Sequence, residues 1–201
     1  MAKLISRRSL LICAAAAGLA PVAGARAAML PATREERLLA RAKAALEYHG
    51  GVVKRRDRIA IVDFSLPSRL PRLDIVDLEG GRVESMLVAH GRGSDPQHSG
   101  WVERLSNEPG SLASSAGAYL TGPLYVGKHG RSRRLVGLDP GNNNAEARAI
   151  VVHGAWYVSP AMAHERGKLG RSEGCFAVDE REIDKLLDRL GEGRLLFADK
   201  S

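Results

Sequence analysis

Seven short runs of apolar and β-branched residues, separated by turn residues, recur along this chain. Runs of this length and composition are typical of β-strands. They fall at residues 58–66, 73–78, 83–89, 117–120, 134–138, 149–153 and 194–198. The second and third runs flank Gly80-Gly81, a pattern typical of a β-hairpin. The sequence therefore predicts a mainly β fold, a sandwich or barrel.

Two helices are expected, one at each end of this series of strands. Thr33 and Glu36 form a capping-box pattern, and the helix that follows should end at Gly50-Gly51. Residues 179–182 precede a second helix, which should stop at Gly191. Its apolar residues share one face: Ile183, Leu186, Leu187 and Leu190. We expect both helices to lie at the periphery of the β structure.

The segments between the expected strands contain no sign of a domain boundary. Residues 90–116 and 127–147 are rich in Gly, Ser, Asn and charge, and are expected to be long loops, which often carry function. There is no internal repeat and no interdomain linker. We expect an N-terminal helical segment at 29–52 and one domain at 53–201.

The first 28 residues have the layout of an export signal. A basic start precedes an apolar run at 10–20, and Ala25-Arg26-Ala27 matches a cleavage pattern. The run is shorter than the ~20 residues that span a bilayer, so no membrane span is expected after the signal is removed. Ser6-Arg7-Arg8-Ser9-Leu10-Leu11 resembles the bacterial twin-arginine signal, which predicts a periplasmic protein. The alternative is an anchor that stays attached.

Removal of residues 1–28 lowers the net charge of the chain and leaves it with a single cysteine. The whole chain has 30 basic and 23 acidic residues, a net charge of +7 that suggests a nucleic-acid partner. The segment holds four basic residues and no acidic ones, which leaves 26 and 23, a net charge of +3. Aromatic residues are only 4% and no nucleic-acid motif is present, so we expect no nucleic-acid partner. One cysteine remains, Cys175, and a single thiol in an exported protein is a candidate reactive group.

A histidine and this cysteine form the candidate catalytic pair. His153 and Gly154 end the strand at 149–153, and Cys175 closes the turn Ser172-Glu173-Gly174-Cys175. A thiol needs a base to become nucleophilic near neutral pH, and imidazole has a suitable pKa. Gly174 leaves room for substrate, and backbone N–H groups of such a turn can stabilise an oxyanion. The alternative is a buried free cysteine and an unrelated surface histidine.

These residues carry a resemblance to a known family. His153-Gly154, 17 further residues and then Ser172-x-Gly174-Cys175 resemble the catalytic signature of YkuD-type L,D-transpeptidases. The mature chain is similar to the branch called the murein L,D-transpeptidase catalytic domain family over about residues 53–199. The matching segments are Asp63-Phe64-Ser65, Val88-Ala89-His90-Gly91, Ser106-Asn107-Glu108-Pro109-Gly110-Ser111, Gly117-x-Tyr119-x-Thr121-Gly122, Gly127-Lys128-His129-Gly130 and Leu169-Gly170-Arg171-Ser172.

The resemblance implies an acyl transfer between peptidoglycan stem peptides, a donor and an acceptor. Cys175 would be the nucleophile that forms a thioester, and His153 the base and later the acid. The turn 172–175, with Ser172 and Gly174, would supply oxyanion donors and orient the imidazole. No metal or organic cofactor is implied. The alternatives are an L,D-carboxypeptidase with water as the acceptor and a non-catalytic wall-binding protein.

The sequence departs from the family motif at two positions. Glu173 stands where the commoner motif has His, and a carboxylate there would raise the pKa of the Cys175 thiol unless it points outward or pairs with Arg171. Phe176 stands where the branch often has Pro, which alters the pocket wall and not the chemistry.

Substrate contacts are expected from Gly154, Arg171 and Glu173 beside the pair, and from four further side chains with alternative roles. His129 either faces substrate carboxylates or belongs to a solvated basic loop. Tyr119 either lies near the donor site or packs in the core. Trp156 and Tyr157 either line the donor groove or pack against neighbours. The histidines have no short metal-ligand spacing, so no metal site is expected, and no oligomeric state is predicted.

Overall fold

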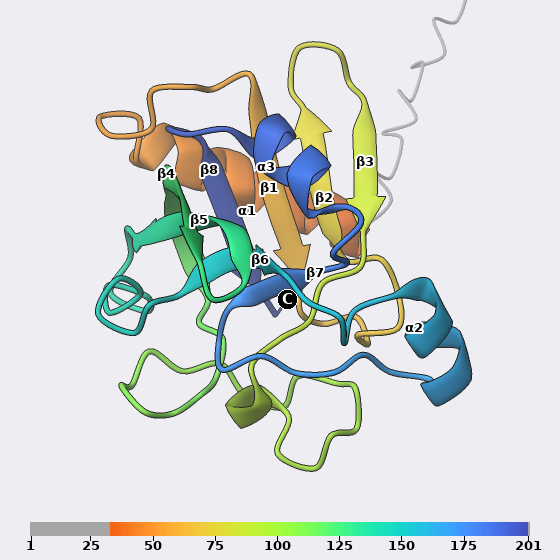
Figure 1. Cartoon of the computed structure of the whole chain (residues 1–201). Coiled ribbons are helices and arrows are strands. Elements are labelled where there is room, and N and C mark those ends of the chain that lie inside the picture. The colour runs from red at the N-terminus through yellow and green to blue at the C-terminus, as the bar shows by residue number, and fades with distance from the viewer. Residues whose placement is uncertain (1–32, 201) are drawn as a thin grey trace, which may run out of the picture. The chain divides into compact units, whose positions relative to one another are not determined.

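The structure is a computed structural model that describes residues 33–200, so the expected signal segment 1–28 lies outside the described residues. Eight strands form one mixed sheet in the order β3-β2-β1-β8-β4-β5-β6-β7 (Figure 1). The strands are β1 Arg58–Asp63, β2 Leu73–Asp77, β3 Val83–Met86, β4 Gly117–Gly127, β5 Gly130–Gly137, β6 Val151–Gly154, β7 Phe176–Val178 and β8 Leu195–Asp199. The helices are α1 Arg34–Tyr48, α2 Pro160–Arg166, α3 Ile183–Leu190 and the short 3-10 helix η1 Arg92–Ser94. The predicted β-rich fold with a helix near each end is confirmed.

The two ends of the sheet approach each other. The chain that leaves β3 forms an antiparallel bridge to β7, in which Ala89 pairs with Ala177. The Ala89 amide donates to the Ala177 carbonyl at 2.8 Å. Since β3 and β7 are the first and last strands of the order, the sheet curls like a barrel and brings β7 beside the long segment 90–116.

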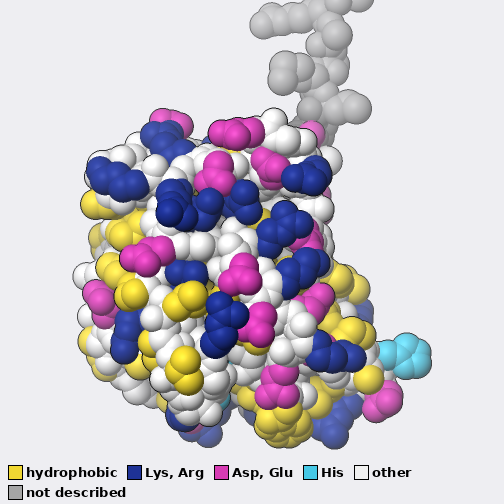
Figure 2. Space-filling model, turned by 45° about the horizontal axis from the view of Figure 1, so that its top comes forward, with side chains coloured by type: hydrophobic (Ala, Val, Ile, Leu, Met, Phe, Trp, Pro, Cys, Tyr) yellow, Lys and Arg dark blue, Asp and Glu magenta, His cyan; other side chains and the backbone are white. Residues whose placement is uncertain are grey.

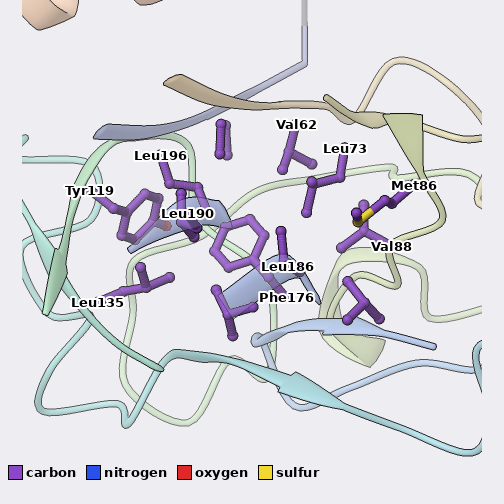
Figure 3. Packing of buried hydrophobic residues seen from close by; sticks show 14 of the residues in the cluster. Val62, Leu73, Met86, Val88, Tyr119, Leu135, Phe176, Leu186, Leu190 and Leu196 are labelled. Atoms are coloured by element: carbon purple, nitrogen blue, oxygen red, sulfur yellow. The ribbon is translucent and has the colours of Figure 1, made fainter. Parts of the chain in front are cut away.

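Alternation along the central strands separates two apolar layers. Ile59 and Phe197 point to the face covered by α1, whereas Val62 and Leu196 point to the other face. On that face Phe176 from β7 packs at the centre of the main core, together with residues of α3 (Figure 3). The core therefore holds β7 firmly, and β7 follows the predicted nucleophile directly.

The helix boundaries follow their sequence signals. The Thr33 hydroxyl accepts from the Glu36 amide at 3.1 Å, and the Glu36 carboxylate accepts from the Thr33 amide at 2.7 Å. This capping box is the predicted one. The α3 helix stops at Gly191, whose φ of 59° lies in the left-handed region that glycine tolerates. Its buried face is the predicted set of four apolar residues.

Three features differ from the expectation. The segment 127–147 is not one long loop, because β4 and β5 form a hairpin joined by Lys128-His129 alone. The strand β7 and the helix α2 were not predicted. Each is short, and the three residues of β7 are too few to show alternation in the sequence.

The surface mixes charges of both signs. In the face shown in Figure 2, Lys and Arg side chains are interspersed with Asp and Glu side chains. Ion pairs join separate elements, such as Arg131 of β5 with Asp184 of α3 at 2.6 Å. Within the described part of the chain, no helix is both long enough and apolar enough to cross a bilayer.

Candidate active site

The pairing of β6 with β7 brings the two predicted catalytic residues to one face of the sheet. The strands are parallel, with Val152 opposite Phe176 and His153 opposite Ala177. Val152 and Phe176 both point into the core. Because side chains alternate along a strand, His153 and the residue before β7, Cys175, point the opposite way. Both side chains line the same cleft.

This cleft has a volume of about 530 Å³. It lies between the β4–β5 hairpin, the 106–115 part of the long loop, and the turn that precedes β7. Residues predicted from sequence that line it are His129, His153, Tyr157, Arg171, Ser172, Glu173 and Cys175. A cavity of this size is within the usual range for small-molecule and peptide sites.

Hydrogen bonds of two serines fix the turn before β7. The Ser172 hydroxyl accepts from the Gly174 amide at 3.2 Å and donates to the Cys175 carbonyl at 2.7 Å. The Ser114 hydroxyl donates to the Gly174 carbonyl at 3.1 Å and accepts from the Gly91 amide at 3.0 Å. Ser172 therefore stabilises the turn from within, and Ser114 connects the turn to the segment 90–116.

The His153 imidazole is buried and held in one tautomer. Its Nδ1 lies 2.8 Å from the Gly154 carbonyl, which only accepts, so Nδ1 carries the hydrogen and Nε2 is the basic nitrogen of the neutral ring. Burial lowers the pKa of His153 to about 4, with further lowering by His129 and Lys128, although the Gly154 hydrogen bond opposes this. The ring is therefore neutral at pH 7.

The Cys175 thiol is half-buried and unpaired with any other cysteine of the described chain. Its Sγ donates to the Ala149 carbonyl at 3.5 Å. Burial raises the pKa of the thiol, and Glu173 adds to the rise, while the Val151 amide and the charges of Lys128 and Arg148 oppose it. The thiol and the imidazole are therefore both neutral at pH 7, so a nucleophilic attack by this thiol would require proton transfer to accompany it.

Two predicted residues with alternative roles acquire definite partners. The His129 ring stacks on the His153 ring, with 4.2 Å between centroids and 22° between planes. Glu173 pairs with Arg92 at 2.9 Å. It does not pair with Arg171, whose guanidinium donates to the carbonyls of Asp95 and Pro96.

Tyr119 and Trp156 lie outside the cleft. Tyr119 is fully buried, because β4 turns its side chain into the core, where its ring meets Phe176 edge-on at 5.4 Å. Its hydroxyl donates to the Ser115 carbonyl at 2.9 Å, and burial raises its pKa to about 12. Trp156 is 72% exposed and does not line the cleft, whereas its neighbour Tyr157 does. Tyr119 thus follows the core-packing alternative, and Trp156 lies outside this cleft.

Gly154 supplies space as well as the carbonyl that holds His153. A Cβ at this position would lie 3.2 Å from Ile183 Cγ2 and 3.3 Å from Glu180 Cα. The glycine therefore allows the end of β6 to pack closely against the start of α3.

Sequence reasoning missed Arg148, which organises the cleft wall. Its guanidinium donates to the carbonyls of Ser106, at 2.7 Å, and Ala113, and to the hydroxyl of Ser115 at 3.1 Å. It thereby ties the 106–115 segment to the start of β6. A single arginine in a polar loop has no distinctive spacing, so only the fold reveals this function.

Metal binding has no support in the described residues. Nowhere in residues 33–200 are three His, Cys, Asp or Glu side chains grouped so that they could hold a metal ion.

Comparisons with known proteins place this chain in a family. The family model described as "L,D-transpeptidase catalytic domain" matches residues 33–198. A comparison with curated protein sequences gave no match.

Solved structures with similar folds were also found. The helical cell shape determining protein Pgp2 from Campylobacter jejuni is 12% identical, with a TM-score of 0.48 over 80% of this chain and 55% of that chain. L,D-transpeptidase 3 from Mycobacterium tuberculosis is 12% identical, with a TM-score of 0.46 over 72% of this chain and 61% of that chain. An L,D-transpeptidase from Xylanimonas cellulosilytica is 18% identical, with a TM-score of 0.40 over 78% and 68%. The chain thus spans little more than half the length of the first two proteins. On the family match, which covers most of its length, the chain belongs to the L,D-transpeptidase catalytic domain family.

Proposed function

We propose that this protein is an exported peptidoglycan L,D-transpeptidase with Cys175 as its nucleophile and His153 as its base. The observation that carries the proposal is the placement of both side chains on one face of the β6–β7 pair, in one cleft. Membership of the L,D-transpeptidase catalytic domain family supports a peptidoglycan-modifying reaction. The N-terminal layout of residues 1–28 supports export by the twin-arginine route.

The first half of the reaction forms a thioester. Nε2 of neutral His153 takes the thiol proton as Sγ of Cys175 attacks the carbonyl carbon of an L-centred stem residue. The Ser172 and Gly174 amides of the turn 172–175 already donate to the His90 carbonyl and to the Ser172 hydroxyl. The remaining backbone N–H groups of this turn, those of Glu173 and Cys175, therefore stabilise the oxyanion. The C–N bond to the D-residue then breaks, and the His153 imidazolium gives its proton to the leaving amine.

The second half transfers the acyl group. The amine of a second stem attacks the thioester carbonyl, and His153 takes a proton from this amine. The C–S bond breaks, the proton returns to Sγ, and a new amide joins the two stems. The resting tautomer of His153 suits both halves, because Nδ1–H stays on the Gly154 carbonyl while Nε2 accepts and donates.

Product analysis tests this proposal. The purified protein is incubated with defined tetrapeptide muropeptides, and the products are sequenced by tandem mass spectrometry. Crosslinked dimers are expected from the wild type and none from Cys175→Ala or Cys175→Ser. Shortened monomers alone would show that water is the acceptor and that the enzyme is a carboxypeptidase. Full crosslinking by Cys175→Ala would refute the assigned nucleophile.

A second measurement needs no natural substrate. A carbapenem such as imipenem should acylate the activated thiol, and intact-protein mass spectrometry should show one increment that Cys175→Ala lacks. A protein that binds the wall without catalysis would show wall pull-down that survives Cys175→Ala, with no adduct and no turnover.

A further inference from the structure

The mechanism above leaves one well-placed side chain without a function. His129 stacks its ring on that of His153 at 4.2 Å, with only 22° between the planes. The two rings differ in environment, because His153 is 2% exposed and His129 is exposed. His129 therefore covers one face of the proposed base and separates it from water.

The hairpin geometry delivers His129 to this position. Strand β5 pairs with β6, and Ser132 lies opposite His153 in the register. The turn before β5 contains only Lys128 and His129, and Gly130 follows with a φ of 72°, in the left-handed region. The tight turn brings the chain back over β6, so a residue three positions before Ser132 reaches the His153 ring.

The stacked ring supplies a restraint that the hydrogen bond of His153 lacks. The bond from Nδ1 to the Gly154 carbonyl fixes one edge of the imidazole and leaves the tilt of its plane free. A flat aromatic group against one face removes that freedom. We propose that His129 is a positioning residue that holds the plane of the His153 imidazole, and with it the basic Nε2, in the cleft that Cys175 also lines. The inference rests on the proposed function and deepens it.

The charges around His129 are compatible with this function. The groups that act on it are Lys128 of its own turn, Glu173 from the turn before β7, and His153 beneath it. Burial and the Lys128 charge lower the pKa of His129, and Glu173 opposes them. A neutral His129 stacks without repulsion on neutral His153. It also presents a π face to the imidazolium that His153 becomes during attack, which is favourable for a cation.

The test compares two substitutions that distinguish stacking by a flat ring from an effect of the ionisable imidazole of His129. His129→Ala removes the ring, and His129→Phe restores a flat ring without an ionisable group. Val126→Ser is the matched control, because Val126 lies on the same hairpin, is 80% exposed and does not line the cleft. Carbapenem acylation is followed by intact mass as a function of pH, and the His153 ring is titrated by NMR in each full-length protein.

The expected result is a slower His129→Ala enzyme and a nearly normal His129→Phe enzyme. Loss of positioning should reduce the acylation rate constant of His129→Ala about tenfold or more. In His129→Ala, the acid limb of the pH profile of acylation and the NMR titration of His153 should both move to higher pH, because water reaches the His153 ring. His129→Phe should recover most of the rate and keep the low titration, and Val126→Ser should match the wild type.

Two results would overturn the inference while leaving the proposed function intact. One is an unchanged rate and an unchanged His153 titration in His129→Ala. The other is a His129→Phe protein as slow as His129→Ala, which would show that the covered face is not what matters. A wild type that gives neither adduct nor crosslink would overturn the proposed function, and the NMR titration would still test whether His129 shields His153.

Discussion

Arg92 donates to the carboxylate of Glu173 at 2.9 Å, beside the thiol that Glu173 precedes by two residues. Glu173 occupies the position where related motifs have histidine, and a free carboxylate there opposes thiolate formation. The arginine comes from η1, at the start of the long segment 90–116. That segment thus supplies the countercharge for a residue of the turn that precedes β7. Both side chains are more than half exposed, so the pair is screened by solvent and its effect is modest.

Substitution of either partner of this pair should change the pKa of Cys175, and the two substitutions should act in opposite directions. Glu173→Gln removes the negative charge and should lower the thiol pKa, whereas Arg92→Ala leaves Glu173 unpaired and should raise it. An exposed pair of this kind contributes less than about 1 kcal/mol, so each change should be a fraction of a pKa unit. The rate of alkylation by iodoacetamide as a function of pH measures it. Identical profiles in both variants would mean that Glu173 does not act on the thiol.

Gly174 is expected to tolerate no side chain. Its φ is 118°, and a Cβ there would lie 2.8 Å from both the Ala113 carbonyl oxygen and Ile150 Cδ1. The Gly174→Ala protein combines backbone strain with a clash against fixed atoms, and should lose about 2 kcal/mol or more of stability together with its activity. Gly51→Ala is the matched control, because nothing lies within 4 Å of a Cβ there. Thermal unfolding and acylation measure both, and a Gly174→Ala enzyme with wild-type stability would contradict the geometry.

The sequence predicts the elements of this fold better than their mutual contacts. The capping box at Thr33 and the apolar face of α3 are local patterns, and both were predicted correctly. Strand β7 was not, because its three residues depend on pairing with β6 and on the Ala89 bridge, which are contacts between distant segments. The sequence left two roles open for Tyr119 for the same reason, since the direction of its side chain depends on the register of β4.

In the candidate site, too, the sequence identifies the residues of a local motif and not those that act through contacts between distant segments. His153 and Cys175 are identifiable because a motif holds them at fixed spacing. Arg148 and the partner of Glu173 are not, because each acts through contacts made across the fold. The stacking of His129 depends on a hairpin turn two residues long, within a segment that composition alone describes as a loop.

Acid should destabilise the protein through His90, which is fully buried. Its Nδ1 accepts from Arg72 at 2.7 Å, and its Nε2 faces the Asp95 carboxylate at 3.3 Å. Burial and the Arg72 charge lower the pKa of His90 to about 3, although Asp95 opposes them. The unfolded chain therefore takes up the proton first, near pH 6.5. Stability from this group is complete above that pH and is lost as the pH falls toward 3.

Denaturant unfolding at pH 8 and pH 5 measures this loss. The wild type should lose free energy of unfolding on the order of 1–2 kcal/mol between these values through His90, and His153 should add to it. His90→Asn should start less stable and lose less on acidification. The exposed residue His164 provides the control, and His164→Asn should follow the wild type. Equal losses in all three proteins would show that His90 is not the titrating group.

Lys128 should select donors that carry a free carboxylate. Arg148 and Arg171 also line the cleft, but the guanidinium of each donates to backbone carbonyls. Among the residues described in this cleft, the Lys128 ammonium has no hydrogen-bond or ion-pair partner, so it is free to meet an anionic substrate. An exposed contact of this kind contributes about 1 kcal/mol, equivalent to roughly fivefold in kcat/KM, and salt should weaken it.

The Lys128→Gln variant needs a crossed design, because Lys128 also influences the pKa of both Cys175 and His153. Two tetrapeptide donors are compared, one with a C-terminal carboxylate and one with a C-terminal amide. Any effect through the catalytic pair lowers both rates equally and cancels in the ratio, whereas loss of carboxylate binding lowers kcat/KM only for the acid. The wild type should prefer the acid about fivefold and Lys128→Gln should not. An unchanged preference in Lys128→Gln would mean that the ammonium acts on the catalytic pair alone, because a charge that binds the carboxylate must discriminate between these two donors.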